Sequence, residues 1–283
     1  MTHWKDKSAI VCGASAGLGR VLATELARQQ VRKLALVARS MENLETLRDE
    51  LLSKHPQLAI DCLTADLCQP DQLQQVTQHT QQQFGAIDLV IQAVGQSDRG
   101  RLLDLTDQRL QELLSINVLS SLHAIQAFSP LMRAVSPPTA SPQPDCGTIV
   151  LIGSLASLFA PRYLGGYAMA KHALAALAQQ ARLELSAQGI HVMLACPGPI
   201  ARSDSGQRYH ELTQNSDLPD SVRQPGGGAR VRGLDAERLA RDILAAAARR
   251  SPLLIRPRRA QVLHWLSALS TRLGDRLLRK NSG

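Results

Sequence analysis

The segment Ser8-Ala-Ile-Val-Cys-Gly-Ala-Ser-Ala-Gly-Leu-Gly19 places a glycine-rich turn directly after a short apolar run. Its glycines follow the pattern G-x-x-x-G-x-G, which has a longer first gap than G-x-G-x-x-G and is one residue longer overall. A glycine turn between a strand and a helix lets the backbone approach a pyrophosphate, whose charge the helix N-terminus then holds. Many such turns serve packing alone, so the motif by itself is weak. Its place after the first expected strand favours a dinucleotide cradle.

Short apolar runs alternate with longer helical patterns along the whole chain. The expected strands are 8–12, 33–38, 59–63, 87–93, 148–152, 191–195 and 253–255. The expected helices are 17–30, 41–54, 70–84, 107–134, 166–188 and 235–249. This alternation is typical of βαβ units, whose parallel sheet is covered on both faces. The predicted fold class is therefore α/β, a Rossmann-like doubly wound parallel sheet.

The chain length of 283 residues suits one α/β domain with one large core. We expect this domain to span residues 1–257, followed by a C-terminal appendage over 258–283. A stretch with four prolines at 136–145 is expected to be a solvent-exposed insertion. Residues 199–233 contain a Pro-Gly-Gly-Gly run and form a loop longer than most connections between a strand and a helix. Such a loop is either functional or disordered, and a mobile substrate lid is the favoured interpretation.

Composition argues against several classes of protein. The net charge is +8, but aromatic residues are not interleaved with the late arginines as a stacking platform, so nucleic-acid binding is not expected. A solvated basic surface that also suits a phosphorylated cofactor is the favoured interpretation. The N-terminus lacks an apolar signal region, and no run of about 18 apolar residues occurs, so we expect neither secretion nor a membrane span.

The cysteines, Cys12, Cys62, Cys68, Cys146 and Cys196, form no CxxC pair, and their odd number argues against a disulfide scaffold. We expect reduced thiols and a cytoplasmic setting. No cluster of His, Cys and Asp has the spacing of metal ligands, so no metal is expected.

Tyr167 and Lys171 lie four residues apart, so they share one face of an expected helix. An ammonium group there favours the phenolate over the phenol and brings the tyrosine's proton within reach of neutral-pH chemistry. Ser154 lies 13 residues before the tyrosine. A Tyr-x-x-x-Lys match occurs by chance in many proteins, so its weight comes from the motifs that accompany it.

The second expected strand ends Val37-Ala38-Arg39-Ser40, without a carboxylate. An acidic residue at this place hydrogen-bonds the adenosine ribose 2′-hydroxyl and repels a 2′-phosphate, whereas an arginine binds that phosphate. The expected cofactor is therefore NADP(H). An exposed arginine at a strand end is the structural alternative, but it does not explain the missing acid.

Together these motifs resemble the short-chain dehydrogenase/reductase family over roughly residues 8–255. The resemblance implies four catalytic positions: Asn117, Ser154, Tyr167 and Lys171. Taken singly, each has an ordinary explanation as a polar helix residue, a turn former or a helix pair. Ser157 competes for the serine role, but it stands only ten residues before Tyr167, and the family spacing favours Ser154.

The same resemblance implies cofactor contacts where the expected strands end. The implied positions are Gly13, Ser15, Gly17, Leu18, Gly19, Arg39, Asp66, Leu67, Ala93, Gly95, Tyr167, Lys171, Pro197, Gly198 and Ile200.

Three departures from the family pattern stand out. Cys12 occupies the usual threonine position before the first glycine, with the loss of one local hydrogen bond. Gln92-Ala93-Val94-Gly95 replaces Asn-Asn-Ala-Gly, which alters a residue that ties neighbouring strands together. Arg202 stands where a threonine often binds the nicotinamide carboxamide, so backbone groups near Ile200, or Ser203, take over in this interpretation.

The resemblance implies an NADP(H)-dependent oxidoreductase that interconverts a carbonyl, in a ketone or aldehyde, and an alcohol. Hydride moves between the nicotinamide and the carbonyl carbon, Tyr167 transfers the proton, and Ser154 holds the carbonyl oxygen. Lys171 lowers the tyrosine pKa and binds the nicotinamide ribose, and Asn117 maintains a water path behind it. Two alternatives stay open: a non-enzymatic NADP(H)-binding regulator, and a peripheral membrane protein with the same fold.

Beyond Arg258 a stripe of apolar residues recurs at helical spacing among arginines, which predicts one basic amphipathic helix. The stripe is Val262, Leu266, Leu269, Leu273 and Leu277, with Trp265 beside it. Such a helix lies on an anionic membrane, covers a lipid-like substrate, or packs on its own chain or a second subunit, and packing is favoured. The tail loosely resembles family members that reduce hydrophobic or lipid-linked ketones. Family members commonly form dimers or tetramers through the helices at 107–134 and 166–188, so a homo-oligomer is expected.

Overall fold

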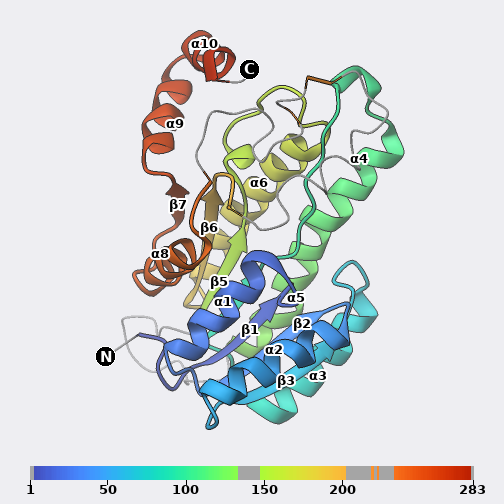
Figure 1. Cartoon of the computed structure of the whole chain (residues 1–283), viewed down its shortest axis with the longest axis vertical. Helices are drawn as coiled ribbons and strands as arrows, with labels where there is room; N and C mark the ends of the chain where they lie inside the picture. The colour runs from blue at the N-terminus through green and yellow to red at the C-terminus, as the bar shows by residue number, and fades with distance from the viewer. Residues whose placement is uncertain (1–2, 133–146, 202–217, 220–221, 223–232, 282–283) are drawn as a thin grey trace.

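The computed structural model describes residues 3–132, 147–201, 218–219, 222 and 233–281 (Figure 1). In this part of the chain the strands form one parallel sheet in the order β3-β2-β1-β4-β5-β6-β7. The strands are β1 (Ser8–Cys12), β2 (Lys33–Ala38), β3 (Ala59–Thr64), β4 (Leu89–Gln92), β5 (Gly147–Ile152), β6 (Ile190–Pro197) and β7 (Leu253–Arg256). The chain reverses its winding direction between β1 and β4, where a doubly wound sheet opens a crevice at its carboxyl edge.

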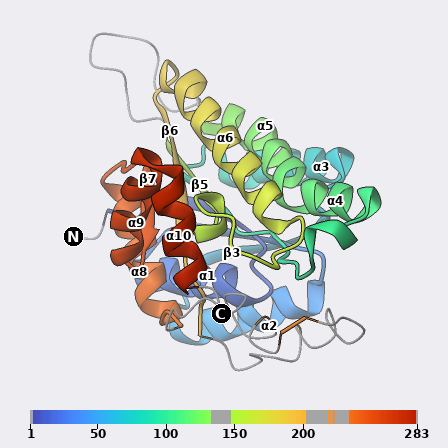
Figure 2. The same cartoon turned by 90° about the horizontal axis from the view of Figure 1, so that it is seen from above.

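Helices cover both faces of the sheet (Figures 1 and 2). One face carries α1 (Gly17–Arg28), α2 (Met41–Lys54) and α8 (Ala236–Ala248), and the other carries α3 (Pro70–Phe84), α5 (Ser120–Met132) and α6 (Tyr167–Ser186). Strand side chains alternate between the two apolar clusters; Ile10 packs into one and Val11 into the other. The strands are therefore apolar on both sides, which confirms the predicted fold class.

Local signals explain where several helices begin. The Ser40 side chain accepts from the Asn43 backbone N–H at 3.4 Å, and Asp235 accepts from Arg238 N–H at 2.7 Å. Helix α3 starts with Pro70, whose missing N–H costs nothing in the first turn. It ends at Gly85, whose φ of +74° suits a residue without a Cβ. Of the expected lid at 199–233, only residues 199–201, 218–219, 222 and 233 are described, and the insertion at 136–145 lies outside the described residues.

The expected single helix at 107–134 is interrupted. It consists of α4 (Asp107–Leu114), a π-helical segment η2 (Ser115–Leu119) and α5. The interruption surrounds Asn117, whose Nδ2 donates to the Leu113 carbonyl four residues earlier, at 2.9 Å. π-turns of this kind are frequent at functional sites, because they aim a side chain that a regular helix would direct elsewhere.

The C-terminal appendage also differs from the prediction of one helix. It forms α9 (Arg259–Leu269) and α10 (Thr271–Asn281), because Ser270 is extended and its side chain accepts from Leu273 N–H at 3.3 Å. Helix α9 follows β7, so it lies at the carboxyl edge of the sheet, and α10 packs against it (Figures 1 and 2). The break splits the apolar stripe between two helices.

Candidate active site

The glycine turn between β1 and α1 is closely packed against the chain after β4. A Cβ on Gly19 would overlap the Gly13 carbonyl and lie 3.3 Å from the Ala93 Cβ. Gly13 has a φ of +81°, and its N–H donates to the Val37 carbonyl at 2.7 Å. Gly19 is thus required because the Gly13 carbonyl approaches it closely, and Gly13 is required because of its positive φ.

The N-terminus of α1 has the character of an anion site. Ala16 is its N-cap and has no side chain that accepts a capping hydrogen bond, and Gly17 is exposed. Ser15 and Leu18, which flank these residues, are half-buried. The first N–H groups of a helix whose N-cap offers no side-chain acceptor are donors for a phosphate, and the helix dipole favours negative charge there.

Arg39 is exposed at the carboxyl end of β2, and it lies near the turn that follows β3. In that turn Asp66 accepts from Cys68 N–H at 2.9 Å, and Leu67 is buried. Burial raises the pKa of the Cys68 thiol, and the hydrogen bond with Ser115 and the positive charge of Arg39 oppose this rise. The Ala65 N–H donates to the Ala38 carbonyl at 3.0 Å, so Arg39, Asp66 and Leu67 lie on neighbouring segments at the carboxyl edge of the sheet.

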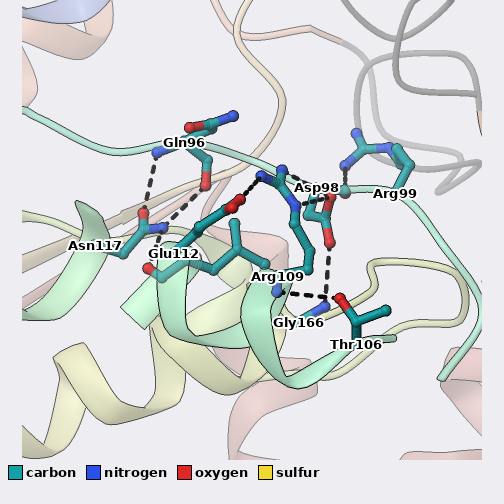
Figure 3. A network of polar contacts seen from close by, with 9 residues as sticks. Gln96, Asp98, Arg99, Thr106, Arg109, Glu112, Asn117 and Gly166 are labelled. Carbon is teal, nitrogen blue, oxygen red and sulfur yellow. Dashed lines mark hydrogen bonds and ion pairs between the residues drawn. The ribbon is translucent and has the colours of Figure 1, made fainter. Parts of the chain in front are cut away.

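Asn117, Gly95 and Lys171 meet at one point. A Cβ on Gly95 would lie 2.9 Å from Asn117 Oδ1 and 3.1 Å from Lys171 Nζ. Asn117 is fully buried, and it exchanges hydrogen bonds with the backbone of Gln96: Oδ1 accepts from the N–H at 3.2 Å and Nδ2 donates to the carbonyl at 3.0 Å (Figure 3). Gly95 leaves the room in which the two side chains approach each other.

Lys171 is buried beneath Tyr167 on the first turns of α6. Its Nζ lies 5.7 Å from the centre of the Tyr167 ring and donates to the Ile152 carbonyl at 3.0 Å. Burial lowers the pKa of Lys171 to about 8. A cation that is costly to keep buried stabilises a nearby phenolate strongly, since few water molecules screen it. The half-buried Tyr167 stands at the start of the helix, where the dipole has the same effect.

The structure separates the two serines that compete for one role. Ser154 lies two residues after β5 and caps the short helix η3 (Leu155–Ser157), which packs against α6. Its half-buried Oγ accepts from Ala156 N–H at 3.1 Å. Ser157 is only 3% exposed, and its Oγ accepts from Ser154 N–H at 3.2 Å. Ser157 is buried and stabilises the turn through this hydrogen bond, whereas Ser154 is only half-buried.

Cys196 lies behind this turn on β6. Burial raises the pKa of its thiol to about 12, although hydrogen bonds from Ser157 and the Ser154 backbone oppose the rise. Burial also raises the pKa of Cys12 to about 12. Neither thiol is ionised at neutral pH, so neither serves as a nucleophile. The four described cysteines are free thiols, and Cys146 lies outside the described residues.

The chain after β6 continues along the carboxyl edge of the sheet. Pro197 ends the strand, and Gly198 N–H donates to the Arg256 carbonyl of β7 at 2.7 Å. Ile200 pairs with Leu234 in a short parallel bridge. These contacts fix the backbone around Ile200, while Arg202 and Ser203 lie outside the described residues.

Gln92 is a structural residue whose role the sequence pattern did not reveal. It is buried, its Nε2 donates to the Ser120 hydroxyl at 3.1 Å, and its Oε1 accepts from Val94 N–H at 3.4 Å. It thus ties β4 to α5. The extra methylene of glutamine, relative to asparagine, is the signal that would have pointed to a more distant partner.

The carboxyl edge of the sheet therefore combines a glycine turn at a helix N-terminus, a tyrosine over a buried lysine, and a serine just after the adjoining strand. Residues 7–212 match the family model described as short chain dehydrogenase. The chain belongs to the short-chain dehydrogenase family. Members of this family are oxidoreductases, and the four positions expected to be catalytic converge in this enzyme at the carboxyl edge of the sheet.

Several proteins are similar to this short-chain dehydrogenase. An uncharacterized oxidoreductase of Staphylococcus epidermidis is 27% identical over 227 residues, which cover 78% of this chain and 91% of the relative. L-sorbose reductase from Gluconobacter frateurii, solved with NADPH and L-sorbose, superposes with a TM-score of 0.74 at 20% identity and covers 89% of this chain and 95% of its own. Levodione reductase superposes with a TM-score of 0.76 at 21% identity, over 89% and 96% of the two chains. The two superpositions show the fold.

The described residues contain no group of three or more His, Cys, Asp or Glu side chains arranged to hold a metal ion. No described helix combines the length and the hydropathy needed to cross a bilayer.

Proposed function

We propose that this short-chain dehydrogenase uses NADP(H) to interconvert a ketone or aldehyde and the corresponding alcohol. The observation that carries the proposal is the buried Lys171 beneath the Tyr167 ring, with its Nζ bound to the Ile152 carbonyl. A buried ammonium of lowered pKa lies beside a phenol that begins a helix, and this arrangement moves a proton at neutral pH.

The residues present fit a dinucleotide carrying a 2′-phosphate. A Cβ would fill the space at Gly13 and Gly19, where the pyrophosphate comes close, and the N-cap of α1 offers no side-chain acceptor to its N–H groups. Arg39 would hold the 2′-phosphate, and Asp66 and Leu67 border the adenine side. Ala93, Gly95, Pro197, Gly198 and Ile200 would line the nicotinamide half with Tyr167 and Lys171.

In the proposed mechanism, the nicotinamide ring supplies or accepts the hydride. Tyr167 donates its phenolic proton to the carbonyl oxygen during reduction and removes it during oxidation. Ser154 donates a hydrogen bond to that oxygen and orients it. Lys171 stabilises the phenolate that remains and binds the nicotinamide ribose, and Asn117 holds the π-turn behind the lysine. Each residue acts on charge that develops in the transition state, which is where stabilisation raises the rate.

The test of this function is NADPH oxidation over a panel of aldehydes, ketones and quinones. The panel should span small polar ketones and long apolar ones, because a hydrophobic or lipid-like substrate is part of the proposal. Turnover of at least one carbonyl supports the enzyme. If no compound of the panel is turned over although NADPH binds, the alternative of a non-enzymatic NADP(H)-binding regulator is favoured.

Cofactor preference depends on Arg39. Replacing Arg39 by alanine should weaken NADPH binding by about 10- to 100-fold, as expected for one charge-assisted contact, and leave NADH binding within about twofold. Fluorescence titration of both nucleotides measures this change. Arg32, an exposed arginine at the opposite end of β2, provides the matched alanine control. NADH binding more tightly than NADPH in the unaltered protein would contradict the assignment.

The C-terminal helices carry a separate proposal, a peripheral contact with an anionic membrane. Val262, Trp265 and Leu269 share one face of α9 and are 61%, 68% and 83% exposed, so the packing expected for the stripe is absent at these side chains. On the other side of α9, the His264 ring lies 6.1 Å from that of Phe159, which follows η3 in the chain. Exposed apolar residues beside exposed arginines suit a surface of acidic lipid.

Vesicle flotation tests the membrane contact. The unaltered chain should float with vesicles containing phosphatidylserine, and the Trp265→Ser, Leu269→Ser double variant should lose most of this binding. Both side chains are exposed, so the fold should survive the change. Leu183→Ser on α6, a leucine 68% exposed, is the matched control. Equal flotation of all three proteins would remove the membrane hypothesis.

Assembly into a dimer or tetramer is also part of the proposal. Leu119 in η2 and Met169 on α6 are 44% and 40% exposed, on the two segments that the family uses for subunit contacts. Apolar side chains in these places support a homo-oligomeric contact.

A further inference from the structure

The loop after β4, residues 96–100, contacts several parts of the site by polar groups (Figure 3). Gln96 exchanges two hydrogen bonds with Asn117, as described above. Arg99 donates through Nη1 to the Asp98 carbonyl at 2.6 Å and through Nε to the Val222 carbonyl at 3.1 Å. Asp98 lies between Gln96 and Arg99 in this loop, and its side chain contacts Gly166, the residue before α6.

Asp98 binds both an arginine and the catalytic helix. Its side chain is 7% exposed, and Oδ1 accepts from Nε and Nη2 of Arg109 on α4, at 3.2 and 3.0 Å. Its Oδ2 accepts from the N–H of Gly166 at 3.4 Å. Arg109 is held in turn by Glu112 at 2.9 Å. The carboxylate therefore links Arg109 on α4 to Gly166, the residue directly before Tyr167 (Figure 3).

Gly166 is the N-cap of α6, and it has no side chain with which to cap the helix. The carboxylate of Asp98 supplies an acceptor and a negative charge from another segment, and both stabilise a helix N-terminus. Arg109 balances the charge. A carboxylate without this partner would oppose the phenolate of Tyr167, since like charges raise a phenol's pKa.

The backbone around Asp98 is shaped for this contact. Gly165 has a φ of +52°, and a Cβ there would overlap Oδ2 of Asp98. Gly100 N–H donates to the Tyr163 carbonyl, and Gly165 N–H donates to the Gly100 carbonyl, both at 3.1 Å. The chain that leads into Tyr167 is thus bound to the loop after β4 by backbone and side chain together.

We propose that Asp98, held by Arg109, is a positioning residue that fixes the start of α6 and thereby the place of the Tyr167 hydroxyl over the substrate. This inference rests on the proposed function of Tyr167. Asp98 acts through Gly166 and transfers no proton. A displacement of about 1 Å in the position of a reacting group lowers the rate on the order of 100-fold. A contact that fixes the position of the tyrosine therefore contributes to the rate.

The kinetic test compares Asp98→Asn with a matched carboxylate at the other edge of the sheet. Asp88 also accepts from a cation, Lys7 at 3.0 Å, and from a backbone N–H, that of Ser8 at 2.8 Å. Asp98→Asn should lower kcat by about 10- to 100-fold and leave the Kd for NADPH within about twofold, because the cradle is untouched. Asp88→Asn should leave kcat within about twofold. Arg109→Met should lower kcat, and Arg109→Lys should recover most of it.

Amide hydrogen exchange provides a second measurement that needs no substrate. In Asp98→Asn, exchange should rise at least about fivefold in the peptide covering Leu164–Ala170, while peptides of β6 keep their protection. Unchanged exchange there would overturn the proposal even if no carbonyl is turned over. When the unaltered enzyme is active, a kcat unaffected by Asp98→Asn, or an equal loss in Asp88→Asn, also overturns it. Loss of activity in Tyr167→Phe tests the proposed function separately.

Discussion

The Tyr167→Phe variant should bind NADPH as the unaltered enzyme does and lose turnover by about 10²- to 10⁴-fold, the usual range for removal of a general acid. The change deletes the phenolic proton and keeps the ring above Lys171, so the helix start and the cradle are unaffected. Steady-state kinetics with the best carbonyl of the panel, together with an NADPH titration, measure the two effects.

The control for this variant is Tyr163→Phe. Tyr163 lies four residues before Tyr167, in the turn that precedes α6, and contacts Gly100 through its backbone carbonyl, which the change does not alter. Its turnover should stay within about threefold of the unaltered enzyme. Full activity in Tyr167→Phe would show that another group donates the proton. A loss of NADPH binding instead of turnover would assign the tyrosine to the cradle.

Lys171→Met should show two opposite effects: turnover falls by about 100-fold or more, and the protein without cofactor becomes more stable at pH 7. The lysine's pKa is about 8 in the folded protein, below its ordinary 10.5, because burial disfavours the charged form. The unfolded chain therefore binds the proton more tightly than the folded one. The cost of charging Lys171 is fully present below pH 8 and disappears as pH rises through 10.5.

Methionine removes this cost but also the hydrogen bond to the Ile152 carbonyl, so the expected gain at pH 7 is about 1–3 kcal/mol. Urea unfolding at pH 7 and pH 9.5 measures it, and the gain should be smaller at the higher pH. Lys33→Met is a close control, because Lys33 donates to the Gln83 carbonyl at 2.6 Å and lies 5.5 Å from the Phe84 ring near the surface. An equal gain at both pH values would contradict the assigned cause.

The sheet could be predicted, and the candidate site residues could be proposed, because their signals are local. The observed β1, β2 and α2 coincide with the expected segments, since apolar alternation, glycine and capping residues act on neighbouring positions. The spacing from Ser154 to Tyr167 favoured Ser154 over Ser157 only by family resemblance. The structure supplies a physical reason, which is the burial of Ser157 beneath the turn. The roles of these residues in catalysis stay a proposal.

Other features could not be predicted, because their causes are distant in sequence. The π-turn at Asn117 depends on the backbone of Gln96, 21 residues away, and no helical pattern contains that partner. The C-terminal break at Ser270 is local, but the apolar spacing continued through it and predicted one helix. The exposure of Trp265 depends on which surfaces α9 meets, whereas packing was favoured because it is the commonest fate of such a helix.

The amino-acid sequence by itself determined the alternating strands and helices, the glycine turn, the missing acid beside Arg39, and the four-residue spacing that brings Lys171 under Tyr167. Each of these follows from short-range periodicity or from the conformational limits of one residue. Only the tertiary structure decided the burial that lowers the lysine pKa and the contact of Asp98 with Gly166 across 68 residues. The reason is that desolvation and long-range hydrogen bonds arise from the order of the strands and the packing around them, which no local pattern contains.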